Sequence, residues 1–438
     1  MYVSTSILVT IGIGLLVSFS ETADRYQTIH LNGTGFGNVS HKAAFSRIQG
    51  SGDMFWWFYP TLAENPTSRP LLLWLDGVVG LAPSMSANFG MIGPYDFKLK
   101  RRNDSWVNDY NLLFVDAPLG SGFSTVAKGK SPPKNLVENT NHLILCLESF
   151  YKDNKEYSNT PVYIFGQGYG AQMAVYLALG IPHAKRISAN LKGVVLGSAI
   201  ISPAKVFTKL GFYLEELGYI DGKGRKAIEE FSDEVNHAVT EHRYEEAYRM
   251  FLKLEYIVNK NANAVSVNLE RILDKMSQDS NRDYFGQLNH LQDTTGYKEN
   301  MKHFMDSTVA PALGISNPNF DSQRKEIIRS FRKSFMIPAV EKVEEVLNNT
   351  NIDVIIYNGN LDAVSNTLGQ LEWVFNLQWS GQANFLSSNR VIFTINNLLE
   401  GYVRKVDRLA FYWINIAGLM TPLDSPIAMK ELVDRTVR

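Results

Sequence analysis

A series of short, continuous apolar runs, separated by helix-like segments, is the feature of this 438-residue chain that most constrains its fold. Runs rich in Val, Ile and Leu are typical of strands that are buried on both faces of a parallel sheet. Their alternation with helices predicts an α/β sheet covered by helices. The expected buried strands are residues 70–75, 112–115, 162–165, 194–196, 354–357 and 391–395, and the expected helices are residues 135–152 and 170–179.

Residues 203 to about 335 interrupt this rhythm. The region is polar and rich in charge, for example over residues 241–249, and it contains no strong strand pattern. Its composition predicts a helical insertion, or cap, between two halves of one sheet, and the sheet is expected to resume at Ile352. The chain from residue 21 to residue 438 is therefore expected to form one domain with this insertion.

The first 20 residues have the pattern of a cleaved signal peptide. Residues 7–19 are apolar apart from Thr10, Ser18 and glycines, and Ser18 and Ser20 are small residues at −3 and −1 of a cut after Ser20. No Lys or Arg precedes the apolar run, and a membrane anchor is the alternative, although the run is short for a span. We expect a secreted protein without a membrane span after cleavage, and a lysosomal destination stays open.

Composition narrows the classes of partner and cofactor. The 43 basic residues nearly balance the 44 acidic ones, so no broad attraction to nucleic acid is expected. No cofactor fingerprint or phosphate-binding loop is present, and we expect no cofactor. Cys146, the one cysteine, lies in an apolar stretch and is interpreted as a core residue. In a secreted chain, four sequons become candidate glycosylation sites, at Asn32, Asn38, Asn103 and Asn348.

Several segments together resemble the serine carboxypeptidase family, and especially its retinoid-inducible branch. The resemblance holds in order and spacing from about residue 40 to the C-terminus. It implies the α/β-hydrolase fold with a helical insertion, and it allows a dimer without requiring one. The segments that carry it are residues 54–59, 70–77, 112–124, 161–171, 357–362 and 417–424.

The resemblance also implies where the catalytic groups should be, and two of the three are missing. An α/β-hydrolase carries its nucleophile in a G-x-S-x-G turn, followed along the chain by Asp and then His. Here the turn holds Gly168 at the serine position, Asp362 keeps the acid position, and Leu419 stands at the histidine position. No histidine follows Asp362 in the chain. Without a nucleophile no acyl-enzyme can form, so we expect no peptidase activity.

The positions that would bind the substrate have changed as well. By the same resemblance, Val78 replaces the glycine that supplies one backbone donor of the oxyanion hole, while the Tyr169 N–H is the second donor. Two family glutamates that bind the substrate's C-terminal carboxylate correspond to Gln167 and Met91. Asp76 stands where many members have Asn or Gln, and an ionised Asp76 would repel a carboxylate.

Other candidate residues fit structural roles better. Ser121 and Ser124 follow a strand without a helix-opening turn, and Ser198 matches a structural segment of the family. His237 and His242 lie five residues apart on a charged segment, which misses the helical metal-ligand spacing. We therefore expect no metal site.

Three functions remain open. The chain is a non-catalytic binder of a peptide or protein, or a carboxypeptidase with unrecognised or residual chemistry, or a structural or storage glycoprotein. The first is favoured because the motifs of the fold persist while the chemistry is erased.

Overall fold

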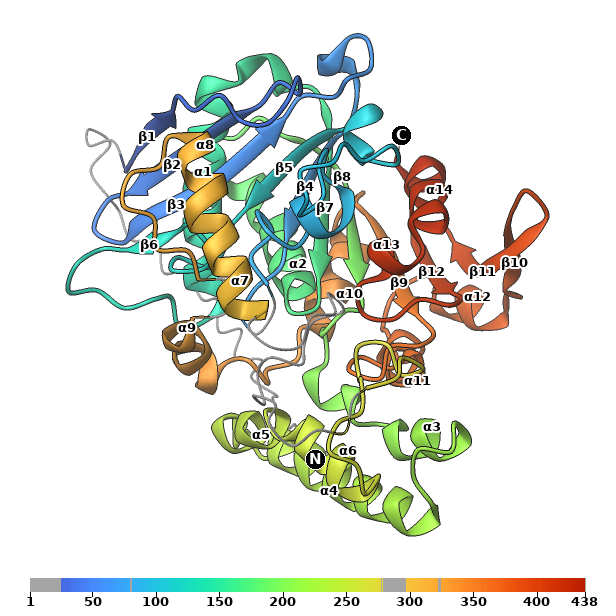
Figure 1. Ribbon diagram of the computed structural model, residues 1–438. Coiled ribbons are helices and arrows are strands. Elements are labelled where there is room, and N and C mark those ends of the chain that lie inside the picture. The colour runs from blue at the N-terminus through green and yellow to red at the C-terminus, as the bar shows by residue number, and fades with distance from the viewer. Residues whose placement is uncertain (1–24, 79–80, 277, 279–296, 322–323, 438) are drawn as a thin grey trace, which may run out of the picture.

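The computed structural model describes residues 25–78, 81–276, 278, 297–321 and 324–437 (Figure 1). A sheet that is parallel at its centre forms the middle of the molecule. Its central strands, in spatial order, are β5 (Asn111–Val115), β4 (Leu71–Leu75), β7 (Pro161–Gln167), β8 (Asn190–Gly197), β9 (Asp353–Gly359) and β12 (Leu409–Ile414). The buried parallel strands predicted over residues 70–75, 112–115, 162–165, 194–196 and 354–357 all lie within or overlap these elements.

Antiparallel strands extend the sheet at both sides. On one side lie β3 (Gly52–Tyr59), β2 (Lys42–Ile48) and β1 (Tyr26–Leu31), with the short β6 (Thr125–Val126) paired to β3. On the other lie β11 (Leu398–Val406) and the edge strand β10 (Val391–Ile395). The expectation that residues 391–395 form a buried strand is wrong, because β10 has a neighbour on one side only. Val391 is 58% exposed and Ile392 64% exposed, while Phe393 is buried.

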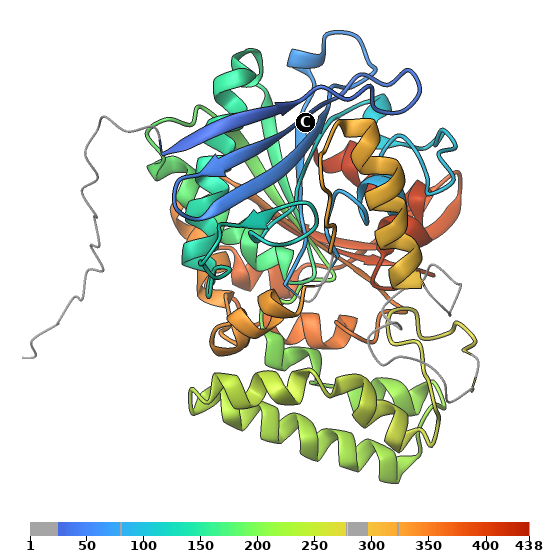
Figure 2. The same cartoon turned by 60° about the vertical axis from the view of Figure 1, so that its left-hand side comes forward.

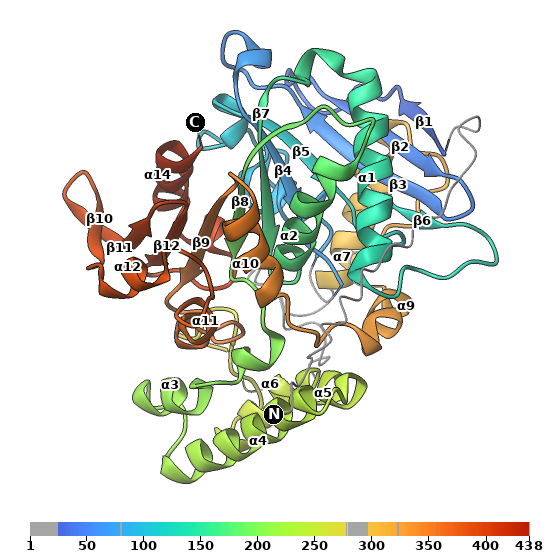
Figure 3. The same ribbon diagram turned by 180° about the vertical axis from the view of Figure 1, so that it is seen from behind.

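Helices cover both faces of the sheet, as the views in Figures 1 and 3 show. The core of one face includes residues of α1 (Leu136–Asp153), α2 (Gly170–Gly180) and α10 (Val340–Asn349). The core of the other includes residues of α8 (Ala310–Leu313) and α14 (Pro426–Thr436), and α7 (Tyr297–Phe304) lies beside it. The predicted helices 135–152 and 170–179 correspond to α1 and α2. Shorter helices are α9 (Lys325–Ser330), α11 (Thr367–Val374), α12 (Gln382–Ser387) and α13 (Thr421–Asp424).

The described elements between β8 and β9 are helical. Four of them, α3 (Leu210–Glu216), α4 (Gly222–Thr240), α5 (Tyr244–Phe251) and α6 (Leu254–Asn261), form a layer beyond one end of the main body (Figure 2). Asp221 caps the first turn of α4 by accepting from the Gly224 N–H at 2.9 Å. The chain then returns to the body, where Phe304 of α7 contacts Phe89. In the described part of the chain, no helix is both long enough and apolar enough to cross a membrane.

Candidate functional site

The predicted site positions come together at one edge of the sheet. Neighbouring parallel strands are in register near their carboxyl ends, as shown by the pairs Leu75–Gly166, Gly197–Tyr357 and Gly359–Ile414. Ligands of open α/β sheets bind at such edges. The site residues follow these strands directly or within a short loop: Asp76 after β4, Gly168 after β7, Asp362 after β9 and Leu419 after β12.

The turn between β7 and α2 keeps the shape of a nucleophile elbow. Gly168 has a φ of 55°, in the left-handed region that favours glycine. Its N–H donates to the Gly197 carbonyl at 3.0 Å, and its carbonyl accepts from the Ile200 N–H at 2.9 Å. A Cβ on Gly166 would lie 2.4 Å from the Gly170 carbonyl oxygen, and a Cβ on Gly170 would lie 2.4 Å from the Leu75 carbonyl oxygen. These two flanking glycines are therefore required by close backbone packing.

The position of the missing serine side chain is open. Among the described residues, a Cβ built on Gly168 would meet nothing within 4 Å beyond its chain neighbours. Tyr169, the next residue, does not fill the space, because its ring is buried and stacks on Phe335 with the ring centroids 4.5 Å apart. The elbow thus presents a backbone turn with room above it and no nucleophilic atom.

Asp362 at the acid position is buried and engaged by its own loop. One carboxylate oxygen accepts from the backbone N–H groups of Val364 at 2.8 Å and Ser365 at 2.9 Å, and the other accepts from the Ser365 hydroxyl at 2.5 Å. Burial raises the pKa of Asp362 to about 6, and the hydrogen bonds from Ser365 and Val364 oppose that rise. These bonds give the carboxylate a structural role that does not depend on a histidine.

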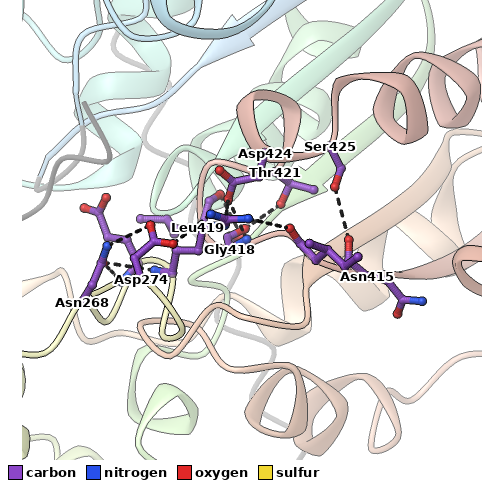
Figure 4. Close-up of polar contacts among 12 residues, drawn as sticks. Asn268, Asp274, Asn415, Gly418, Leu419, Thr421, Asp424 and Ser425 are labelled. Carbon is purple, nitrogen blue, oxygen red and sulfur yellow. Dashed lines mark hydrogen bonds and ion pairs between the residues drawn. The ribbon is translucent and has the colours of Figure 1, made fainter. Parts of the chain in front are cut away.

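Leu419 at the histidine position is half-buried, and both its backbone N–H and its carbonyl have hydrogen-bond partners. Its carbonyl accepts from the Gln167 side-chain amide at 2.7 Å and from the Ser198 hydroxyl at 3.2 Å. Its N–H donates to the Glu270 carbonyl at 2.7 Å. Figure 4 shows polar contacts of this loop, with Asn415, Gly418, Leu419, Thr421, Asp424 and Ser425 labelled. The loop that would carry a catalytic base is therefore held by hydrogen bonds to three other residues of the site, Gln167, Ser198 and Glu270.

The positions of the predicted carboxylate-binding pair have separate roles. Gln167 is buried, and its side-chain oxygen accepts from the Tyr357 hydroxyl at 3.2 Å, so both ends of its amide have partners. Met91 belongs to the π-helical turn Asn88–Ile92 and packs in the apolar core on the opposite face of the sheet from α2. Neither side chain can supply the charge or proton that a pair of glutamates would supply.

The oxyanion segment keeps an unusual backbone. Val78 has a φ of 55°, which is rare for a β-branched residue, and its side chain is buried in the core on the α2 side. Asp76 accepts from the Gly77 N–H at 2.7 Å, and burial raises its pKa well above the ordinary value of 3.8. The raised pKa favours neutral Asp76, so repulsion of a carboxylate is expected only at a pH above it.

The remaining residues that the sequence analysis singled out lie outside the elbow and the two loops of the site. The Ser124 hydroxyl accepts from the Phe55 N–H and donates to the Asp116 carbonyl. Ser121 is buried, and Cys146 is fully buried. His237 pairs with Glu241, whereas His242 contacts Tyr244, and no three potential ligands in the described ranges are placed to hold a metal ion. The four sequon asparagines, Asn32, Asn38, Asn103 and Asn348, are exposed.

Sequence reasoning did not find Glu270, which the helical insertion delivers to this site. Its side chain is 3% exposed, and the acid groups of Asp362, Glu255, Asp424 and Asp76 are near enough to act on its pKa. The available signal was a single acidic residue among the alternating apolar and polar residues 265–273.

Comparison with known proteins agrees with this architecture. A model of the family described as serine carboxypeptidase matches residues 34–438. The chain belongs to the serine carboxypeptidase family. It is 32% identical to the retinoid-inducible serine carboxypeptidase of Rattus norvegicus, with 85% of each chain covered. It is 31% identical to the Homo sapiens protein of that name, again with 85% of each covered.

A solved structure shows the same fold. The prohormone-processing carboxypeptidase Kex1 from Saccharomyces cerevisiae superposes with a TM-score of 0.75 at 20% identity, covering 93% of this chain and 95% of that one. The α/β-hydrolase fold expected from the sequence is thereby confirmed. This serine carboxypeptidase family member keeps the family's elbow, but it carries glycine and leucine where the resemblance implies serine and histidine.

Proposed function

We propose that this family member enters the secretory pathway, does not hydrolyse peptides, and binds a peptide or protein through the former catalytic cleft. The observation that carries the proposal is the state of the elbow. The turn at Gly168 has a φ of 55°, which glycine adopts without strain, and a Cβ there would meet no atom of the described residues within 4 Å beyond its chain neighbours. Asp362 and Leu419, by contrast, have their polar groups engaged elsewhere. An open turn without a nucleophile suits binding and does not suit acyl transfer.

Inactivity is tested with a fluorophosphonate probe, which reacts with activated serines, and with release of C-terminal amino acids from peptides. The purified full-length protein and its Gly168→Ser variant should both stay unlabelled, because no histidine follows Asp362 to activate a hydroxyl. Heat-denatured protein is the control for nonspecific labelling. Labelling of the native protein alone, together with amino-acid release, would favour the alternative of a carboxypeptidase with unrecognised chemistry.

Binding in the cleft is tested with a matched pair of glycine variants. Gly168 and Gly129 both have positive φ, and a Cβ on either meets nothing within 4 Å. Gly168→Leu would fill the space at the elbow, whereas Gly129→Leu places the same side chain in an exposed loop. A pooled hexapeptide library is incubated with each protein, and retained peptides are counted by mass spectrometry. We expect Gly168→Leu alone to reduce retention. Equal retention by both variants, or none by the wild type, would count against cleft binding.

A further inference from the structure

Residues 266–274, called here the strap, leave the helical layer after α6 and lie against two loops of the site. The Ala363 N–H donates to the Leu269 carbonyl at 2.8 Å, and the Ile272 N–H donates to the Leu361 carbonyl at 2.9 Å. The Glu270 carbonyl accepts from the Leu419 N–H at 2.7 Å. Three backbone hydrogen bonds therefore join the strap to the loop after β9, which carries Asp362, and to the loop after β12, which carries Leu419.

Side chains reinforce the position of the strap. Leu269 and Ile272 are 6% and 0% exposed, and both belong to the core on the α2 side. A Cβ on Gly418 would lie 2.0 Å from the Glu270 carbonyl oxygen, so the two backbones approach as closely as glycine permits. Arg271 contacts Asp274 at 2.8 Å and Asp424 at 3.6 Å. Figure 4 shows Asn268 and Asp274 of the strap beside Gly418 and Leu419.

The place of these contacts matters for access to the site. Asp362 and Leu419 mark the positions of the acid and of the base, at the carboxyl ends of β9 and β12. A ligand that reaches the backbone of Leu419 must compete with the Glu270 carbonyl for the Leu419 N–H. The strap is thus hydrogen-bonded to the two loops that carry the acid and histidine positions.

Glu270 links this arrangement to pH. Among the described residues, four carboxyl groups act on it: Asp362 after β9, Glu255 on α6, Asp424 on α13 and Asp76 after β4. Within the described ranges, the adjacent Arg271 pairs with Asp274 and Asp424, and the Tyr219 hydroxyl donates to the Ile272 carbonyl. Burial first, and then these four carboxyls, raise the pKa of Glu270 well above its ordinary value of 4.5.

The sign of the effect follows from linkage. With the strap detached, the Glu270 carboxyl would be solvated and its pKa would return toward 4.5. The attached state therefore binds the proton more tightly than the detached state. Acid favours attachment, and ionisation of Glu270 as the pH rises favours detachment.

We propose that the strap closes the acid–histidine half of the cleft at acidic pH and is released as the pH rises toward neutrality. Attachment of the strap does not require a ligand. The inference that the strap controls ligand access rests on the proposed function. Because closure can be measured without a ligand, its failure and the failure of peptide binding are separate results.

Hydrogen exchange of the full-length protein tests the closure. The amides of Ala363 and Leu419 are the reporters, because both donate to strap carbonyls, and amides of β7 and β8 are the reference for global opening. Exchange is measured at pH 5.0 and 7.5 and corrected for the intrinsic rate at each pH. Between the pKa of Glu270 in the detached state and its pKa in the attached state, protection of the reporter amides should fall about tenfold for each pH unit. It should also fall further than the protection of the reference amides. Unchanged reporter protection, or a fall that matches the reference amides, would overturn the proposal.

Two variants assign the effect to one carboxyl. Glu270→Gln keeps the side-chain shape but cannot ionise, so the extra pH dependence of the Ala363 and Leu419 amides should disappear. Glu234→Gln removes an exposed carboxyl on α4 of the same helical layer and should keep the wild-type response. A wild-type response in Glu270→Gln contradicts the assignment. If Glu270→Gln does not fold, the wild-type comparison between reporter and reference amides still decides the proposal.

Discussion

At the carboxyl end of β7, the residue change leaves open space above Gly168, whereas at the carboxyl ends of β9 and β12 the polar groups are fully engaged. Both carboxylate oxygens of Asp362 accept hydrogen bonds, and the N–H and carbonyl of Leu419 both have partners. The nucleophile half has lost a side chain and kept its backbone. The acid–histidine half is held by hydrogen bonds, some of them from the helical insertion. Restoring one half would therefore leave the other unable to assist it.

The largest effect is expected where the elbow depends on close backbone packing. Gly170→Ala would place a Cβ 2.4 Å from the Leu75 carbonyl oxygen, so β4 and α2 must move apart. Such overpacking against backbone should lower the free energy of unfolding by about 3 kcal/mol or more, measured by urea denaturation. Gly222→Ala, also at the first position of a helix, meets only the Glu215 carboxylate at 3.4 Å and is the control. Equal stability of the two variants would show that β4 and α2 can move apart at the elbow without loss of stability.

A smaller effect is expected at the contact between the two halves. Gln167→Glu would replace the amide donor to the Leu419 carbonyl by a buried oxygen. The free energy of unfolding of the variant should be lower by about 2–3 kcal/mol at pH 7.5. The ionised Glu side chain cannot donate a hydrogen bond, so its buried, charged oxygen would face the Leu419 carbonyl oxygen. The loss should shrink at pH 5, where a protonated Glu can donate. Gln49→Glu, in an exposed turn, is the control. If the variant were as stable as the wild type at both pH values, the hydrogen bond from Gln167 to the Leu419 carbonyl would not stabilise the contact between the two halves.

Much of the nucleophile half could be predicted from the sequence. The apolar runs located β4 and β7, and the glycines around position 168 marked the turn, because a sharp strand-to-helix connection needs residues without a Cβ at close approaches. The order of the motifs also placed Asp362 and Leu419 at the same edge of the sheet. These features are local in the chain, so a single sequence carries them.

The strap and the sheet edge could not be predicted in the same way. The Glu270 carbonyl and the Leu419 N–H are 149 residues apart in numbering, and backbone hydrogen bonds leave no side-chain pattern. Residues 391–395 have the composition of a buried strand, yet β10 lies at the edge because the chain adds no strand beyond it. Which apolar run becomes an edge is decided by topology rather than by local composition.

Proton binding sharpens the comparison, because two carboxyls with raised pKa values, those of Asp362 and Glu255, act on Glu270 beside the acid–histidine half. Burial raises the pKa of Asp362 from 3.8 to about 6 and that of Glu255 from 4.5 to about 7. Since the folded state holds these protons more tightly than the unfolded chain, the stabilisation is present below pH 4 and is lost as the pH rises through 6 to 7. The melting temperature should therefore be higher at pH 5.0 than at pH 7.5, and Glu255→Gln should reduce the difference. A higher melting temperature at pH 7.5 would contradict this sign.

The smallest effect is expected from restoring the serine. Gly168→Ser meets no steric obstacle, but it places a side chain on a residue with a φ of 55°, which costs about 1–2 kcal/mol. Gly129→Ser, with a φ of 78° and equally open surroundings, should cost a similar amount in thermal denaturation. A clear rise in the melting temperature of Gly168→Ser alone would show that the elbow favours a serine and would contradict the strain argument. The added hydroxyl should remain unreactive, because Leu419 cannot accept its proton and Asp362 has no histidine to orient. The open half of the site has space for a side chain, whereas the strap and Gln167 hold the half that would have to supply the base.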